Sequence, residues 1–197
     1  MQNITIIDTG CANLSSVKFA IERLGYQAEI SRDLTKLKQA DKLLLPGVGT
    51  ANAAMHNLQQ RNLIATIQQL TQPVLGICLG MQLMTSFSQE GNLQTLGLMS
   101  GETQKLPDNG LPLPHMGWNQ VNFSENEALF ADIPNSSYFY FVHSYAVLPN
   151  ENTIATCEYG VPFSAALHKD NFYGVQFHPE RSGKVGAQLL RNFIERI

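Results

Sequence analysis

The sequence predicts an α/β fold in which helices flank a mixed, mostly parallel β-sheet. In the first half of the chain, short apolar stretches at residues 4–8, 42–45 and 73–77 alternate with segments whose apolar residues recur at helical spacing. Strands that are apolar on both faces and alternate with helices are typical of a parallel sheet covered by helices. In the second half, strand-like segments follow one another, so we expect the sheet to gain antiparallel strands there.

The elements of the first half are separated by ordinary turn and helix-stop residues. Residues 4–8 are predicted to form a buried strand that runs into a turn at Thr9-Gly10. A helical stripe follows and stops at Gly25, a common helix terminator; its apolar positions are Leu14, Val17, Ile21 and Leu24. Further strands are expected at residues 27–30 and 42–45, and further helices at residues 51–58 and 63–70.

Residues 73–87 predict a strand that turns sharply into a helix, with Cys78 at the turn and a glycine two residues to either side, Gly76 and Gly80. This pattern is that of a nucleophile elbow. The turn sets the sulfur over a helix N-terminus, which favours the thiolate, and aims the backbone N–H of Leu79 where an oxyanion would form. The apolar positions expected on the helix are Leu79, Leu83, Met84 and Phe87.

Taken alone, Cys78 could equally be a buried structural cysteine, because short matches to this pattern arise by chance. The run His178-Pro179-Glu180, 100 residues downstream, favours a catalytic role. A cysteine nucleophile needs a base, and the base needs an orienting group. In an extended segment residues i and i+2 project to the same side, so Glu180 can reach His178. Each motif ends an apolar strand, and together they predict a triad of Cys78, His178 and Glu180.

The loop after the third strand reads Pro46-Gly47-Val48-Gly49. It can be a plain turn between a strand and a helix, but it lies at the sheet edge where ligands bind in open α/β folds. Glycines there can turn backbone N–H groups toward an anion, so we interpret Gly47, Val48 and Gly49 as the second half of an oxyanion hole. It is not a nucleotide-binding loop, because no Gly-Lys-Ser/Thr follows. Gly47 and Gly49 are free to take positive φ whereas Val48 resists it, which predicts a switchable peptide at Val48.

Residues 89–126 are rich in Gly, Pro and Asn and show few helical stripes. Residues 111–119 are predicted to form a loop, in which Trp118, the chain's only tryptophan, either fills a gap in the core or contacts a partner. No repeat or linker interrupts the chain, so residues 1–197 are expected to be one domain. Strands are expected at residues 138–142, 153–157, 162–168 and 172–177, followed by an amphipathic helix with Val185, Leu189, Leu190, Phe193 and Ile194.

The composition narrows the function classes. The formal net charge of −3 argues against nucleic acid or an anionic membrane as the main partner. Neither a signal peptide nor a membrane span is evident, and three scattered cysteines (Cys11, Cys78 and Cys157) argue against a disulfide framework. We therefore expect a cytoplasmic protein. No metal site is expected, because four further histidines lack ligand spacing, and His143 is expected to be structural; the four are His56, His115, His143 and His168.

With these motifs in place, the chain resembles the class I, triad-type glutamine amidotransferases over nearly all its length. More narrowly, it resembles the glutaminase subunits of imidazole glycerol phosphate synthases. The narrower likeness rests on the Pro-Gly-Val-Gly loop and on residues 114–119, 138–145 and 173–180. Between Asp8 and Leu14, Thr9 and Ala12 replace the tyrosine and the second glycine usual in that family. This departure puts details of a partner-facing loop in doubt, but not the triad.

The resemblance implies a flavodoxin-like fold, an activity and no cofactor. The Cys78 thiolate would attack the side-chain amide of glutamine, His178 would act as general base and acid, and Glu180 would orient the imidazole. Backbone N–H groups of Leu79 and residues 47–49 would hold the oxyanion, and water would release glutamate from the thioester. The substrate-holding groups implied are Gln82 and the backbone of Ser144 and Tyr145.

The resemblance also implies a heterodimer with a (β/α)₈-barrel cyclase. The cyclase would use the ammonia to make imidazole glycerol phosphate and aminoimidazole carboxamide ribotide in histidine biosynthesis. The expected contact surface includes Asn13, Trp118 and Arg181. One alternative is a free-standing cysteine hydrolase of γ-glutamyl substrates, which would act alone and would not need the Trp118 loop. A catalytically dead binding domain would typically have lost Cys78 or His178.

Overall fold

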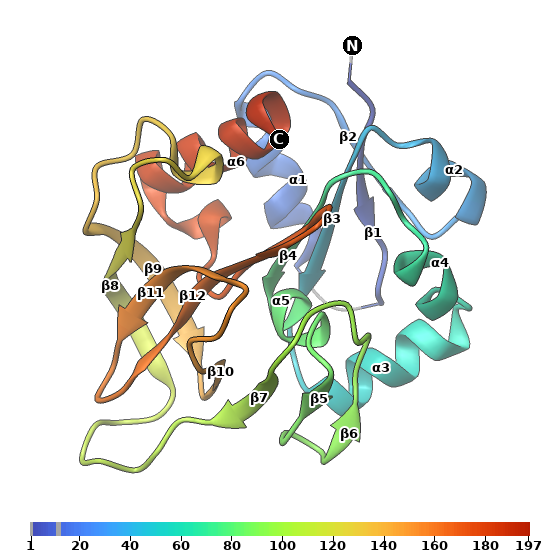
Figure 1. The fold of residues 1–197 in the computed structure, drawn as a ribbon. Helices are drawn as coiled ribbons and strands as arrows, with labels where there is room; N and C mark the ends of the chain where they lie inside the picture. Colours follow the sequence, from blue (N-terminus) through green and yellow to red (C-terminus); the bar gives the residue numbers. More distant parts are fainter. Residues whose placement is uncertain (1, 11–12) are drawn as a thin grey trace.

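The computed structural model describes residues 2–10 and 13–197, so Cys11 and the departure at Ala12 lie outside the described residues. The predicted fold class is confirmed: the described chain forms a large mixed sheet flanked by helices (Figure 1). Its strands, in spatial order, are β2 (Ala28–Ser31), β1 (Ile4–Ile7), β3 (Lys42–Gly47), β4 (Val74–Cys78), β13 (Phe172–Val175), β12 (Pro162–Lys169), β11 (Thr153–Glu158), β8 (His115–Phe123) and β9 (Ser137–His143).

A second, smaller sheet lies beside the carboxyl end of β4. Its strands, in spatial order, are β10 (Tyr145–Val147), β7 (Glu102–Lys105), β5 (Phe87–Ser88) and β6 (Leu93–Gln94). The helices are α1 (Leu14–Arg23), α2 (Leu34–Gln39), α3 (Ala51–Gln60), α4 (Ile64–Gln68), α5 (Leu79–Leu83) and α6 (Gly183–Arg196), with 3₁₀ turns η1 (Ala128–Phe130) and η2 (Pro179–Arg181).

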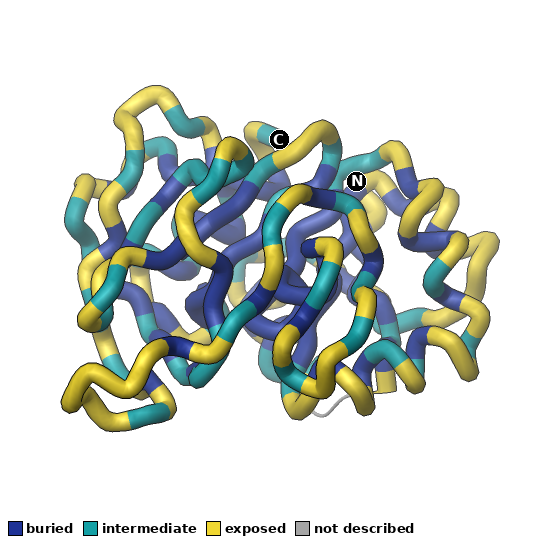
Figure 2. The backbone as a smooth tube through the Cα atoms, turned by 60° about the horizontal axis from the view of Figure 1, so that its bottom comes forward, coloured by how far each residue is buried: buried dark blue, intermediate teal, exposed yellow. Residues whose placement is uncertain are grey.

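The parallel part of the large sheet, from β1 to β4, is buried on both faces, which explains its apolar strands. Helices α1 and α6 cover one face, where Ile6 and Leu75 point, while α3, α4 and α5 cover the other, where Leu43 and Leu45 point. In Figure 2 the buried residues run through the middle of the molecule and the exposed ones lie along the outer helices and loops. Such two-sided burial favours a parallel sheet.

Strands β1, β3, β4 and β13 run parallel, so their carboxyl ends meet at one edge. In the register of β3 and β4, Gly47 lies opposite Cys78. The strand that precedes His178 pairs with β4 on the other side, with Val175 opposite Ile77. The fold therefore brings the three motifs together at the sheet edge where open α/β sheets bind ligands. The antiparallel strands expected in the second half are also present, from β12 to β9.

Two sequence expectations around the elbow and the tryptophan are wrong. The helix after Cys78 ends at Leu83, and Phe87 lies in β5. The helix ends there because a later loop hydrogen-bonds to its last carbonyl groups: the Leu96 N–H donates to the Leu83 carbonyl (2.8 Å). Residues 115–119 are not in a loop but in β8, paired antiparallel with β9 so that Trp118 lies opposite Tyr140. Prolines and Gly117 obscured this strand in the sequence.

Helix α2 was not expected from the sequence. It is short, and only Leu37 on it is buried, so it leaves no apolar stripe. The Asp33 side chain stabilises its start by accepting hydrogen bonds from the N–H groups of Thr35 (2.9 Å) and Lys36 (3.1 Å). The stretch that begins at residue 89, where the sequence showed few helical stripes, contributes strands β6 and β7 of the small sheet.

Candidate active site

Cys78 lies at a strained turn between β4 and α5, with φ 54° and ψ −112°. Positive φ at a residue other than glycine is uncommon and marks a sharp, over-determined turn. The flanking glycines are required by close approach of the chain. A Cβ on Gly80 would lie 1.8 Å from the Leu45 carbonyl oxygen, and one on Gly76 would lie 2.8 Å from the backbone nitrogen of Met81. The elbow predicted from the sequence is therefore present in the structure.

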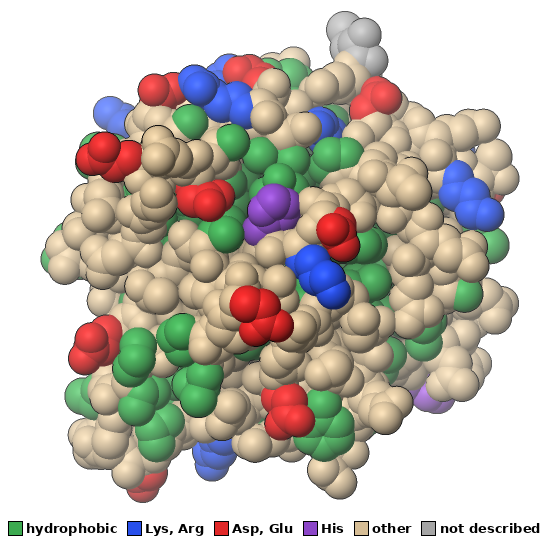
Figure 3. All heavy atoms as spheres, in the orientation of Figure 1, with side chains coloured by type: hydrophobic (Ala, Val, Ile, Leu, Met, Phe, Trp, Pro, Cys, Tyr) green, Lys and Arg blue, Asp and Glu red, His purple; other side chains and the backbone are tan. Residues whose placement is uncertain are grey.

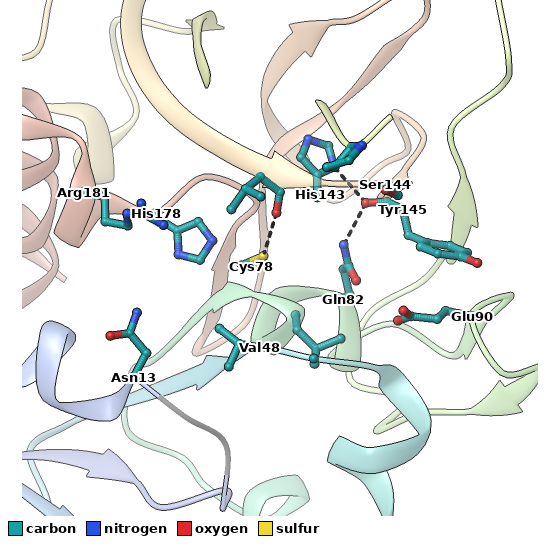
Figure 4. Close-up of a pocket in the computed structure, with 14 residues that line it drawn as sticks. Asn13, Val48, Cys78, Gln82, Glu90, His143, Ser144, Tyr145, His178 and Arg181 are labelled. Atoms are coloured by element: carbon teal, nitrogen blue, oxygen red, sulfur yellow. Dashed lines mark hydrogen bonds between the residues drawn. The ribbon is translucent and has the colours of Figure 1, made fainter. Parts of the chain in front are cut away.

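The elbow opens into a pocket of about 380 Å³ (Figure 4). It brings together ten of the residues predicted for the site: Asn13, Val48, Gly49, Cys78, Leu79, Gln82, Ser144, Tyr145, His178 and Arg181. Three predicted residues lie outside its lining. Glu180 and Gly47 lie beneath it, around a much smaller cavity, and Trp118 lies on the exposed face of β8.

His178 and Glu180 form a buried pair, with 2.8 Å between Nδ1 of the imidazole and a carboxylate oxygen. The expected extended geometry is wrong, because residues 179–181 form a 3₁₀ turn in which the Arg181 N–H donates to the His178 carbonyl (3.0 Å). The turn is tied to β9: the His178 N–H donates to the Tyr140 carbonyl (2.9 Å), and the Tyr140 N–H donates to the Ser182 hydroxyl (2.9 Å). These bonds fix the backbone that carries the imidazole.

The surroundings of His178 favour its charged form. Burial lowers its pKa, but hydrogen bonding to the Cys78 sulfur and to Glu180, together with the charges of both groups, outweighs burial and raises the pKa of His178 to about 10. Since Nδ1 is committed to Glu180, the buried Nε2, which has no oxygen or nitrogen partner among the described residues, is the nitrogen available for proton transfer. The arrangement suits an imidazolium beside a thiolate.

Cys157 offers a contrast to Cys78. It is buried in β11, and burial raises the pKa of its thiol to about 12. A thiol in apolar surroundings is inert, whereas Cys78 has a base close by and opens into a pocket. Both cysteines are free of disulfides. Among the described cysteines, Cys78 is thus the one suited to nucleophilic chemistry.

The loop at residues 46–49 takes a conformation that differs in part from expectation. Gly49 has a positive φ of 92°, as predicted, but Gly47 is part of strand β3 and has no positive φ. Gly47 is needed for a different reason, because a Cβ there would lie 2.7 Å from the Gly80 nitrogen. The loop is consequently packed directly against the elbow, with Val48 and Gly49 at the pocket wall.

Comparison with known proteins places these features in a family. Residues 5–197 match the model of the family "Glutamine amidotransferase class-I". The chain belongs to this family. It is 71% identical, over its full length and 99% of the relative, to the imidazole glycerol phosphate synthase subunit HisH of Haemophilus influenzae (strain 86-028NP). It is 68% identical, with both chains fully covered, to the subunit of the same name from Pasteurella multocida (strain Pm70).

Solved structures of distant relatives share the fold of this amidotransferase. A glutamine amidotransferase from Thermotoga maritima superposes with a TM-score of 0.67 at 17% identity, covering 99% of this chain and 97% of the other. The glutaminase domain of a Trypanosoma brucei CTPS, solved with bound acivicin, gives a TM-score of 0.66 at 15% identity, covering 100% of this chain and 95% of the other. At these identities the likeness establishes the fold alone.

Two residues of the amidotransferase site were missed by sequence reasoning. The pocket wall includes Glu90, whose carboxylate accepts a hydrogen bond from the Ala51 N–H (3.0 Å) at the start of α3. Gln176 is fully buried and its side-chain amide donates to the Cys78 sulfur at 3.7 Å. Glu90 lies in a stretch without a motif, so no sequence signal identifies it. Gln176 stands two residues before His178 in the matched run, and this position was a usable signal.

Beside the pocket, aromatic and cationic side chains lie along the rim. Arg181 sits over the ring of Tyr140 (4.5 Å), and Trp118 contacts the same ring edge-on, with 6.1 Å between centroids. Trp118 is 54% exposed, so the alternative that it fills a core gap is wrong. Met116 and Tyr138 are also exposed on the β8–β9 ribbon. On the face shown in Figure 3, Lys and Arg side chains form small separate groups rather than a continuous basic patch.

His115 and His143 are buried side by side and share a hydrogen bond of 2.9 Å between Nδ1 of His115 and Nε2 of His143. His143 uses Nδ1 to donate to the Tyr145 carbonyl (2.8 Å), so its Nε2 must accept the proton of His115. The Asn119 amide then donates to Nε2 of His115 (3.2 Å). Every contact is satisfied with both rings neutral. Burial lowers the pKa of His115 to about 4 and, with the nearby charges of His115 and His178, that of His143 to about 3.

The histidine pair predicts a loss of stability in mild acid. In the unfolded chain each imidazole takes a proton below about pH 6.5, whereas the folded chain resists protonation until about pH 4. Because the unfolded state binds more protons in that interval, the free energy of unfolding should fall as the pH is lowered from 6.5 toward 4. Urea denaturation at several pH values measures this slope.

The control is a change that keeps the contacts of His143 but cannot titrate. His143→Gln should make the free energy of unfolding depend less on pH between 6.5 and 4, because the amide cannot titrate. The amide can still donate to the Tyr145 carbonyl and accept from His115. His143→Phe should lower stability at every pH, since it removes both hydrogen bonds. If the free energy of unfolding of His143→Gln depends on pH as steeply as that of the wild type, the histidine pair does not cause the loss of stability in acid.

Among residues 2–10 and 13–197, no group of three or more His, Cys, Asp or Glu side chains is placed to hold a metal ion. In the same part of this amidotransferase, no helix is long and apolar enough to cross a membrane.

Proposed function

We propose that this chain is the glutaminase of an imidazole glycerol phosphate synthase. It hydrolyses glutamine through Cys78, His178 and Glu180 and passes the ammonia to a (β/α)₈-barrel cyclase subunit, in histidine biosynthesis. The observation that carries the proposal is the elbow cysteine facing, in one pocket, a histidine held by a buried carboxylate. The relatives named HisH, at 71% and 68% identity, supply the reaction context.

The proposed chemistry proceeds in two steps. The Cys78 thiolate attacks the side-chain amide carbon of glutamine, and the oxyanion that forms is held by backbone N–H groups of Leu79 and the 47–49 loop. His178 gives its Nε2 proton to the amide nitrogen, so ammonia leaves and a glutamyl thioester remains. Water then attacks the thioester while His178 takes its proton, and glutamate and the thiolate are released. Glu180 keeps Nδ1 protonated and the ring aligned throughout.

The other end of the pocket suits the amino-acid end of glutamine. Glu90 is the one carboxylate among the described residues that line this pocket, and Figure 4 shows Gln82 between it and Cys78. A carboxylate at that place can pair with the substrate's α-ammonium group. The backbone of Ser144 and Tyr145 forms the adjacent wall. The proposed substrate orientation therefore runs from the amide at Cys78 to the ammonium at Glu90.

We expect Glu90→Gln to raise the KM for glutamine by about tenfold to a hundredfold, the effect of losing a charge-assisted hydrogen bond. The kcat should change little, because the group is remote from the reacting amide and contributes the same binding before and during reaction. In Glu90→Gln the new side-chain amide oxygen can still accept a hydrogen bond from the Ala51 N–H, so helix α3 should still begin at Ala51. Steady-state kinetics decide the point, with the exposed Glu102→Gln as control. An unchanged KM would remove Glu90 from the substrate site.

The rim of the pocket is the proposed docking surface for the barrel subunit. Asn13 and Arg181 line the pocket itself, and Trp118 stands next to Arg181 through their shared contact with Tyr140. Exposed aromatic and Arg side chains are the residue types that dominate binding energy in protein interfaces. A partner seated there would cover the mouth of the pocket and receive ammonia without its loss to solvent.

Val48→Gly should raise glutamine hydrolysis by the isolated chain and shrink the stimulation given by the partner. The β-branched side chain resists the backbone conformation that would turn an N–H into the pocket, and glycine removes this resistance. One missing oxyanion donor costs about a hundredfold or more in rate, which sets the size of the possible gain. Glutamate release by the two isolated chains provides the measurement. Equal basal rates would mean that Val48 is not the control point.

The experiment that tests the proposed function compares glutamate release by the chain alone, with the barrel subunit, and with the barrel subunit and its ribotide substrate. We expect the isolated chain to be nearly silent and the full complex to couple glutamate release to ribotide conversion. A free-standing γ-glutamyl hydrolase would instead be fully active alone and indifferent to both additions.

A further inference from the structure

Gln176 is buried directly between the candidate nucleophile and the substrate wall, and the proposed mechanism gives it no task. Its side chain is completely shielded from solvent. The side-chain oxygen accepts from the Gln82 amide (3.0 Å), and the side-chain nitrogen donates to the Cys78 sulfur (3.7 Å). The contact to sulfur is at the long end of the range for such a bond, as expected for a large, polarisable acceptor.

The orientation of the Gln176 amide is dictated by a backbone carbonyl two contacts away. The Tyr145 carbonyl can only accept, so the group that Gln82 places against it at 2.8 Å must be the NH₂ end. That same NH₂ group faces Gln176, which must therefore present its oxygen to Gln82. The NH₂ end of Gln176 is left facing the sulfur. The order of contacts thus guarantees a donor, and not a carbonyl oxygen, beside Cys78.

Besides His178, two neighbours of the sulfur act on its protonation in opposite directions. As a thiol it can donate to the Val142 carbonyl at 3.9 Å, whereas as a thiolate it can accept from Gln176. An N–H donor stabilises the charged form and a carbonyl stabilises the neutral form. Gln176 therefore favours the thiolate over the thiol, as His178 does.

We propose that Gln176 is a positioning residue that donates a hydrogen bond to the reactive thiolate of Cys78, with its amide orientation set by Gln82 and the Tyr145 carbonyl. The inference rests on the proposed function only in taking Cys78 as the nucleophile of the reaction. Its effect on the sulfur does not depend on which substrate the pocket binds.

The test measures the rate at which iodoacetamide alkylates Cys78 in the full-length chain at fixed pH, followed by mass spectrometry of the peptide that contains it. Gln176→Leu removes the donor, and alkylation should slow about tenfold, because a hydrogen bond to a charged group is worth that much or more. Gln82→Met frees the Gln176 amide to turn and should slow alkylation by about threefold. The double variant should be no slower than Gln176→Leu, since Gln82 acts through Gln176.

Asn192→Leu is the matched control, because Asn192 is also a fully buried amide; it donates to the carbonyls of Leu129 and Ala131 and accepts from the Gln188 side-chain amide. It should lower thermal stability without changing Cys78 alkylation. In the glutaminase assay, Gln176→Leu should lower kcat in the same proportion as alkylation and leave KM within about twofold of wild type.

Wild-type alkylation in Gln176→Leu would overturn the inference, as would multiplicative losses in the double variant. If Gln176→Leu does not fold, Gln82→Met decides: alkylation at the wild-type rate would equally overturn it. If alkylation depends on Gln176 but the coupled assay shows no glutamine hydrolysis, the inference stands and the proposed function fails.

Discussion

The Cys78→Ala variant is expected to release no measurable glutamate from glutamine while keeping its fold and its binding to the barrel subunit. Without the sulfur no thioester can form, and no other described cysteine reaches the pocket. The cost in stability should be small, because the hydrogen bonds of the sulfur with Gln176 and with the Val142 carbonyl are long, at 3.7 and 3.9 Å. Glutamate release in the coupled assay and thermal unfolding measure the two properties.

An ammonium salt provides the internal control for Cys78→Ala. The complex with this variant should still convert the ribotide when ammonium is supplied, because the chemistry of the barrel is separate from that of the glutaminase. Cys157→Ala and Cys11→Ala should both retain glutaminase activity. Activity that survives in Cys78→Ala and disappears in Cys11→Ala would show that the elbow is not the catalytic centre.

The second large effect is expected for His178→Ala, which should reduce glutamine turnover nearly as much as loss of Cys78. Removing a general acid–base costs about 10²–10⁴ in rate, and His178 also holds the thiolate through its positive charge. Glu180→Gln should be milder, because an amide oxygen at 2.8 Å can still hold Nδ1 in place without the negative charge. Single-turnover rates of glutamate release compare the two.

The double variant His178→Ala/Glu180→Gln tests whether the two side chains act together or independently in catalysis. Glu180 acts only through the imidazole, so the double change should cost about as much as His178→Ala alone. Losses that multiply would mean that Glu180 has a second task. Arg191→Gln, at a half-buried position of α6, is a control for loss of a charge and should leave turnover unchanged.

Local steric constraints explain why the elbow could be predicted from the sequence. Gly76 and Gly80 are needed because the backbone packs too closely against itself to admit a Cβ at either position. Such a constraint requires glycine at fixed positions, and this requirement is visible in the sequence. The sheet could also be predicted, because two-sided burial demands continuous apolar runs such as residues 74–77. The proximity of His178 and Glu180 was expected for a wrong geometric reason, since a 3₁₀ turn and not an extended strand joins them.

What could not be predicted depends on contacts between distant segments. The end of α5 is set by Leu96, whose N–H takes the Leu83 carbonyl. The pairing of His115 with His143 follows from the register of β8 and β9, which no local pattern encodes. Glu90 reaches the pocket only because a loop folds back onto the start of α3. A polar residue in such a place has no periodic signal, so only the folded chain reveals it.

The turn that carries His178 also covers part of the edge of the large sheet. Strand β9 is the last strand of the large sheet, and an unprotected edge strand can pair with other chains. Both backbone polar groups of Tyr140 on this edge are occupied by the turn, through the His178 N–H and the Ser182 hydroxyl. If the turn detaches, the enzyme loses its base and exposes an aromatic strand edge in the same event. Thermal inactivation and self-association should therefore begin together, and a partner that clamps the turn would protect against both.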